Sequence, residues 1–261
     1  MVQLLEQLVS TRRHPNLILH CGANKVERRE VEKVPTPRAT STWTPIPHLQ
    51  LIQRVEKTLA ANQLTTGTFA HSLSHDGARY FGLMEVTNGE NSDDYCWVLG
   101  LRNSHDKTFP AGVVAGASVF VCDNLSFSGE MKLSRKHTTF IVRDLPMLVE
   151  RGIGRMLEKW HDQHVRFDAY KNKRINELAA HDLIIRATDV GVCSNRLIPN
   201  VLHQWREPEH EQFETRNVWS LFNAFTAALK EGSLAELPKR TEALHGLLDS
   251  HVGLAKKFST S

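Results

Sequence analysis

The triplet Ser-His-Asp occurs twice in the chain, at residues 74–76 and 104–106. A histidine beside an aspartate can hold a metal ion or transfer protons, and a nuclease could use such a set. Aspartate also favours turns, because its side chain accepts hydrogen bonds from the backbone amides that follow it. The pair Asp76-Gly77 is a turn signal that needs no catalytic role. We therefore favour turns at both triplets and keep a catalytic site as the alternative.

A second candidate is the pair His161 and His164, whose spacing places both rings on one face of a helix. This spacing suits a metal ion, but the glutamate of the H-E-x-x-H pattern is missing. His164 also falls on the apolar stripe of the predicted helix, which favours a packed or capping histidine. Glycine-rich phosphate loops and the G-x-S-x-G elbow do not occur in the chain. We predict no metal and no cofactor.

The elements that must position these residues follow from apolar spacing. Four prolines between residues 35 and 47 exclude regular structure there and predict an N-terminal arm over residues 1–47. Apolar residues recur at three- and four-residue spacing over 48–61, which predicts an amphipathic helix. The β-compatible runs that follow are 68–73, 78–87, 95–102, 112–122 and 137–142.

The apolar period changes near Asp144, which we interpret as a helix N-cap followed by Pro146 in the first turn. A long helix with an apolar and aromatic face comes next, and further helices are predicted over 179–188, 196–205, 218–229 and 234–248. The sequence thus predicts an α+β fold, with an antiparallel sheet and a flanking helix over 48–144 and a helical bundle over 145–261.

Composition indicates an ordinary globular protein, with 41% hydrophobic and 23% charged residues in 261. No apolar run is long enough to span a bilayer, and residues 1–13 lack the pattern of a signal peptide. The four cysteines are scattered, so we expect reduced thiols. These features predict a cytoplasmic protein without a membrane partner.

Basic residues are concentrated after the predicted sheet, although the net charge is only +3. Residues 132–143 contain no acid, and seven cations face three acids over 151–174. Residues 207–214 are acidic, so the chain is bipolar. The basic stretch is either a solvated surface or a track for phosphates. The residues of this candidate track are Lys132, Arg135, Lys136, Arg143, Arg151, Arg155 and Lys159.

Two stretches together resemble domain of unknown function family 932, which occurs in phages and plasmids. The first runs from Asn103-Ser104-His105-Asp106 to Val121-Cys122-Asp123-Asn124, similar to the family pattern N-S-H/Y-D followed by V-C-x-N-G. The second, residues 217–226, is similar to the family's W-x-L-x-N-A-x-T helix. Lys107 and Leu125 stand where the family usually has glycine. The resemblance covers residues 48–230 and implies a setting in mobile elements, with no established activity.

The predicted order of elements also resembles that of single-strand annealing proteins of the RecT and Erf type. A cationic groove with aromatic faces would suit single-stranded nucleic acid. Phe127, Phe140 and Trp97 are the candidate stacking residues, but core packing is the interpretation that we favour for these rings. The leading hypothesis is therefore a non-enzymatic, oligomeric protein that binds or anneals single strands or protects a genome.

Two alternatives stay open. One is a metal-dependent phosphodiesterase or anti-restriction enzyme that uses Asn103, His105 and Asp106 with His75 and Asp76. The other is an inhibitor that binds a host defence protein through its acidic surface.

Overall fold

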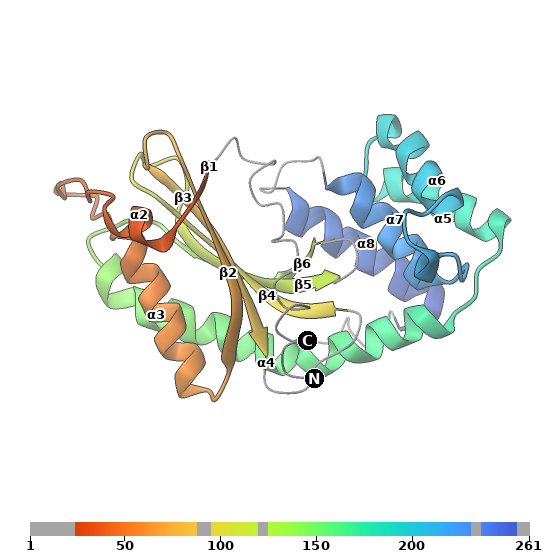
Figure 1. Ribbon diagram of the computed structural model, residues 1–261, viewed down its shortest axis with the longest axis horizontal. Coiled ribbons are helices and arrows are strands. Elements are labelled where there is room, and N and C mark those ends of the chain that lie inside the picture. The colour runs from red at the N-terminus through yellow and green to blue at the C-terminus, as the bar shows by residue number, and fades with distance from the viewer. Residues whose placement is uncertain (1–23, 88–94, 120–124, 231–235, 255–261) are drawn as a thin grey trace, which may run out of the picture.

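The computed structural model describes residues 24–87, 95–119, 125–230 and 236–254. Its first half forms one antiparallel sheet, in which six strands follow one another in chain order (Figure 1). Each strand can therefore pair with the next through a short connection, as hairpins do. The strands are β1 (Asn24–Val26), β2 (Thr65–Ser74), β3 (Arg79–Thr87), β4 (Tyr95–Ser104), β5 (Ala111–Val119) and β6 (Leu125–Arg135).

Helices flank the sheet and make up the second half of the chain (Figure 1). The predicted α+β class is confirmed, and the predicted helix over 48–61 forms with those bounds. The α-helices are α2 (Arg28–Glu32), α3 (His48–Ala61), α4 (Ile141–Asn172), α5 (Glu177–Asp189), α6 (Ile198–Arg206), α7 (Val218–Leu229) and α8 (Leu237–Val252). Two 3-10 turns, Asn195–Leu197 and Glu211–Phe213, precede α6 and α7. None of the described helices is long and apolar enough to cross a bilayer.

The hairpin between β2 and β3 turns through residues with left-handed backbone. The φ angles of His75, Asp76 and Gly77 are 54°, 53° and 83°. Glycine and aspartate adopt this conformation more easily than most residues, so the Asp-Gly signal has a direct physical cause. The prediction of a turn at residues 74–77 is confirmed.

One predicted strand, residues 137–142, is wrong. The last strand of the sheet ends at Arg135, and α4 begins at Ile141 with Phe140 as its N-cap. Threonine, phenylalanine, isoleucine and valine give this stretch strand propensity, but Ile141 and Leu145 are buried on the same face of a helix. Tertiary burial therefore overrides local propensity. Asp144 lies in the first helical turn and is not the N-cap.

Residues 24–47, assigned from sequence to an N-terminal arm, pack on the sheet. β1 pairs with β2, and the side chains of Val31 and Ile46 are almost fully buried. Residues 1–23 of the arm lie outside the described residues.

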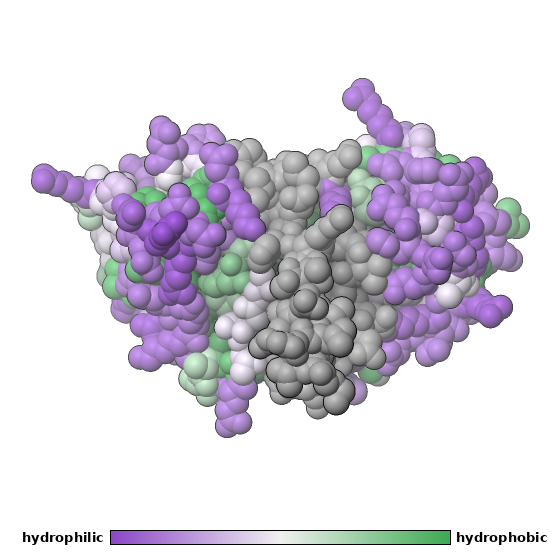
Figure 2. Space-filling model, in the orientation of Figure 1, coloured by the Kyte–Doolittle hydropathy of each residue, from purple (hydrophilic) through white to green (hydrophobic). Residues whose placement is uncertain are grey.

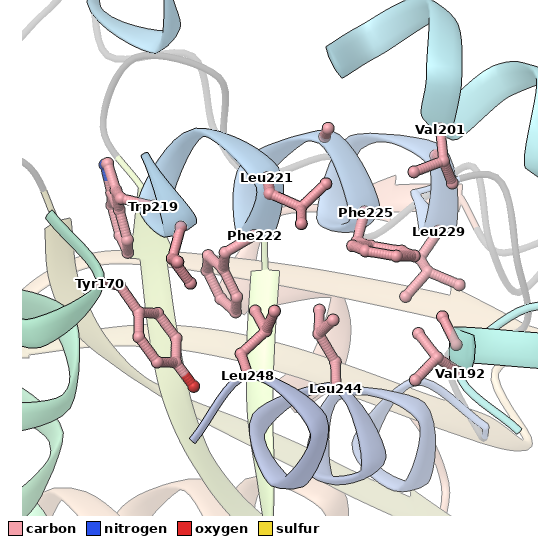
Figure 3. Close-up of a cluster of buried hydrophobic side chains, with 14 of the residues drawn as sticks. Tyr170, Val192, Val201, Trp219, Leu221, Phe222, Phe225, Leu229, Leu244 and Leu248 are labelled. Atoms are coloured by element: carbon pink, nitrogen blue, oxygen red, sulfur yellow. The ribbon is translucent and has the colours of Figure 1, made fainter. Parts of the chain in front are cut away.

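The two faces of the sheet contribute to two apolar clusters. Met84 and Leu99 belong to a cluster with α3 and the first half of α4. Leu83 and Val98, their neighbours along the strands, point the opposite way and belong to a cluster with the second half of α4 and the later helices. α7 and α8 face each other inside this second cluster (Figure 3). α4 is therefore common to both clusters.

A buried polar network ties α4 to α8. The guanidinium of Arg166 pairs with the carboxylate of Asp249, with nitrogen–oxygen distances of 2.9–3.0 Å. The Tyr170 hydroxyl donates to the same carboxylate at 2.7 Å. Only 6% of the Asp249 side chain is exposed. A buried carboxylate needs such partners, because it has lost its hydration.

Replacing Asp249 with alanine should lower the free energy of unfolding by about 3–5 kcal/mol, because Arg166 would lose the carboxylate that offsets its buried charge. Urea denaturation followed by circular dichroism measures this loss. The control is Asp182→Ala, which breaks the exposed pair of Asp182 with Arg186 and should cost less than about 1 kcal/mol. Equal small losses in both variants would contradict a stabilising network.

Candidate nucleic-acid interface and the histidine turn

The outer face of α4 carries an exposed aromatic ring and a row of cations. Phe140, the N-cap, is 54% exposed, and the guanidinium carbon of Arg143 lies 4.5 Å from the centre of its ring. Met147 is 48% exposed one turn further on. Arg151 and Arg155 follow at helical spacing and are exposed. These residues lie on one side of α4 because its other side is buried on the sheet.

The segment before α4 adds two more cations to this face. Arg135 ends β6 and Lys136 follows it, and both side chains are exposed. Arg135 and Arg143 both form ion pairs with Asp144, the latter at 2.8 Å. Hydrogen bonds from Arg143 and then Arg135 hold the pKa of Asp144 below its usual value. The carboxylate thus neutralises part of this charge and fixes both guanidinium groups near the start of α4.

The remaining predicted binding residues are less accessible to a nucleic acid, or their side chains lie outside the described residues. Lys159 is half-buried and pairs with Asp162 at 3.7 Å. Lys132 lies on β6, but its side chain is outside the described residues, as is that of Phe127. Trp97 is a core residue: it is 3% exposed and stacks on Trp160 with ring centres 4.6 Å apart. Trp97 is therefore not a stacking face for a base, and the favoured interpretation of core packing is confirmed for this ring.

The turn after β4 is braced by its own polar side chains. Asp106 accepts hydrogen bonds from the Thr108 amide at 3.0 Å and from Arg79 Nε at 2.6 Å. Although burial opposes it, these hydrogen bonds lower the pKa of Asp106 to about 2. The Ser104 hydroxyl donates to the carbonyl of Phe109 at 2.8 Å. The expectation that this triplet is a turn is therefore supported by its contacts.

Asn103 and His105 point inward from the same strand end. The Asn103 amide nitrogen donates to the carbonyl of Ile46 at 2.9 Å and to Nδ1 of His48 at 2.8 Å. His105 Nε2 donates to the same carbonyl at 2.9 Å. Both residues are buried, and their hydrogen bonds to Ile46 and His48 connect the start of α3 to the sheet. Sequence reasoning missed His48 as their partner, because 55 residues separate it from Asn103.

The five residues of the enzyme alternative do not form a metal site in the structure. Asn103 and His105 are buried, Asp106 is bound by Arg79, and His75 contacts the hydroxyl of Ser74. Within the part of the chain that the structure describes, no three histidine, cysteine, aspartate or glutamate side chains are grouped to hold a metal ion. His164 bonds to the Tyr95 hydroxyl, whereas His161 is exposed.

A family model described as a domain of unknown function matches residues 38–250 of the chain. The chain belongs to this family, DUF932. No curated protein and no solved structure matched it. The DUF932 match spans the sheet, the turn after β4 and the helices up to α8.

The backbone at Lys107 gives a physical reason for the glycine that DUF932 proteins usually have at this position. Lys107, which stands where the family usually has glycine, has a φ angle of 65°. A residue with a Cβ atom adopts this backbone at a cost of about 1 kcal/mol, whereas glycine does not. The Lys107 ammonium lies 4.9 Å from the centre of the Trp43 ring, a cation–π contact that offsets part of this strain. Asn124 lies outside the described residues.

The second DUF932 stretch forms α7 and is structural. Asn217 caps the helix, because its side chain accepts from the Ser220 amide at 2.8 Å. Asn223 and Thr226 bond to backbone carbonyls of their own helix. Trp219 and Phe222 face Tyr170 and Leu248 in the second cluster (Figure 3).

The acidic stretch, residues 207–214, lies between α6 and α7 beside a small pocket. The pocket has a volume of about 190 Å³ and is lined by polar side chains that include Gln204, Glu209 and Asn223. In the view of Figure 2, hydrophilic residues dominate the described surface at both ends of the molecule. In the protein-inhibitor alternative, the acidic residues 207–214 would contact the host defence protein.

Replacing Asn103 with alanine should lower the free energy of unfolding by about 2 kcal/mol or more, because His48 Nδ1 would be left buried without its donor. Chemical denaturation measures the loss, and Asn195→Ala, at an exposed position, is the matched control. The enzyme alternative forecasts instead a variant of normal stability that has lost metal-dependent cleavage. That result would contradict the structural role of Asn103.

Proposed function

We propose that this DUF932 protein is a non-enzymatic, cytoplasmic protein of mobile elements that binds single-stranded nucleic acid as an oligomer. The observation that carries the proposal is the exposed ring of Phe140 among the cations of the α4 face. We define this α4 face as Phe140 with Arg135, Lys136, Arg143, Arg151 and Arg155.

The chemistry of the α4 face suits an unpaired strand. Binding without sequence preference needs cations that follow the phosphates and an aromatic ring on which a base can stack. Phe140 is the one aromatic residue among the strongly exposed apolar side chains of the described chain. Arg143 already lies over one face of the ring, so a base can extend this stack or replace the guanidinium.

The spacing of the cations also suits a strand. Lys136 and Arg155 are separated by 19 positions, and the helical part of that span rises about 1.5 Å per residue. The α4 face therefore extends for more than 20 Å along the helix axis, enough for several nucleotides. Asp144 competes with phosphate for Arg135 and Arg143. Lys136, Arg151 and Arg155 form no ion pair with any carboxylate of the described residues, so they are then the main phosphate contacts.

Binding should weaken steeply with salt, because each neutralised phosphate contributes about 0.7 to the slope of log K against log salt. Reversal of Lys136, Arg151 and Arg155 to glutamate should weaken binding alike for all sequences. It should also flatten the slope by about 2, the sum for three lost contacts. Fluorescence anisotropy with a labelled 40-nucleotide strand measures both quantities.

The matched control reverses three exposed cations of the helical half, Arg174, Arg196 and Lys239, and should leave the slope unchanged. Equal effects of the two triple variants would contradict the α4 face as the binding site. No binding by the wild-type protein at low salt would overturn the proposed function and favour the protein-inhibitor alternative. Cleavage of the strand after addition of Mg²⁺ would favour the enzyme.

A further inference from the structure

Three buried histidines meet where the N-terminal residues cross the sheet. His48 begins α3, His105 follows β4, and His137 lies between β6 and α4, and each is at most 7% exposed. The rings of His48 and His105 are stacked, with centres 3.9 Å apart and planes 7° from parallel. Two rings in this contact cannot both be protonated without strong repulsion.

A hydrogen bond requires the neutral form of His48, and burial favours the neutral form of His105. Nδ1 of His48 accepts from Asn103, so the ring carries its proton on Nε2 and donates to the carbonyl of Gly77 at 2.9 Å. His105 Nε2 donates to Ile46, and its Nδ1 is buried with no partner. Within the described chain, both ring nitrogens of His137 are also buried and form no hydrogen bond of normal geometry. The backbone of Thr44 acts on the His137 ring in favour of its protonated form, but within the described chain no acceptor is bonded to Nδ1 of His105.

These histidines hold a segment that we call the strap, residues 40–47. Its middle is bound to the residues before α4, because the Thr44 amide donates to the carbonyl of His137 at 3.1 Å. Its end is bound to β4 through Ile46, which accepts from Asn103 and His105. Prolines at 45 and 47 have no amide hydrogen to add further backbone bonds. Besides the burial of Ile46, the contacts of Asn103, His105 and His137 therefore hold the strap in place.

We propose that the strap is a proton-operated latch, which is released from β4 and from the start of α4 when the three histidines take up protons. In the closed latch the rings are neutral and packed together. In the open latch they reach water and can be protonated. This inference is independent of the proposed nucleic-acid binding.

The charges around the three rings oppose protonation in the closed state. Burial, and then His105 and His137, lower the pKa of His48 to about 4. Burial also lowers the pKa of His105 and of His137. Asp106 is the acid that acts on His105 in the opposite direction, but it is paired with Arg79. Tyr80 stacks on His48 as a neutral phenol, and Lys107, on the Trp43 ring, adds positive charge nearby.

Opening should therefore be coupled to proton uptake as the pH falls below about 6.5, the usual pKa of an exposed histidine. Each proton taken up adds about 1 to the slope of the logarithm of the opening constant against decreasing pH. Uptake by all three rings would make opening up to about 1,000-fold more frequent per pH unit.

Hydrogen exchange of the Thr44 amide, corrected for the intrinsic effect of pH, measures strap opening. Amides of Phe222 and Phe225 in α7 report global unfolding in the same experiment. We expect Thr44 to exchange through a separate, local opening, at least tenfold more frequent at pH 5 than at pH 6. The test variant is His137→Phe, which removes a titrating ring and keeps an aromatic side chain at this position.

His137→Phe should lower the pH slope of Thr44 exchange by about 1, whereas His161→Phe, at an exposed position on α4, should leave it unchanged. Equal slopes in the wild type and His137→Phe would overturn the latch. Should His137→Phe not fold, the wild-type slope still decides. A Thr44 opening constant that does not change between pH 7 and pH 5, or that matches that of α7 throughout, contradicts the proposal.

Discussion

Burial of one side of α4 is the constraint from which the rest of the arrangement follows. Ile141, Val149, Ile153 and Met156 are fully buried in the first cluster, and Phe167 is fully buried in the second. Each such side chain contributes about 1.5–3 kcal/mol when it leaves water. The rotation of the helix about its axis is then fixed over its whole length. Its opposite side, with Phe140 and the cations, must face solvent.

The same constraint connects the α4 face to the turn after β4, which contains His105. α4 begins four residues after His137, whose carbonyl is bound by the strap and whose ring lies in the buried cluster. The strap is held in turn by Asn103 and His105 of the DUF932 turn. A family motif that looks catalytic in sequence thus positions backbone in the structure. Each of its four side chains forms at least one hydrogen bond within the protein.

Sequence predicted the elements that depend on local pattern. The helix at 48–61 and the hairpin at 74–77 follow from period and turn chemistry, and both are confirmed. The class of fold and the DUF932 resemblance are confirmed as well. Residues 137–142 were misassigned because β-branched residues favour a strand locally, while burial of Ile141 favours a helix. Core packing, the favoured interpretation of the aromatic rings, is confirmed for Trp97 and wrong for Phe140, because composition does not tell which side of an element is covered.

The candidate site was less accessible to sequence reasoning. The row of cations was visible as a charge pattern, but its pairing with Asp144 and the exposure of Phe140 depend on how α4 lies on the sheet. The contact of Asn103 with His48 joins elements far apart in the chain and has no local signal.

The most direct test of the proposed function is photo-crosslinking with a single strand in which bromouracil replaces thymine, followed by mass spectrometry of the peptides. Bromouracil reacts with aromatic side chains in close contact, so the account predicts a main crosslink at Phe140. Phe140→Ala should remove this crosslink, while Leu178→Ala, at an exposed apolar position on α5, should not. Crosslinks confined to other parts of the chain, or none at low salt, would contradict binding at the α4 face.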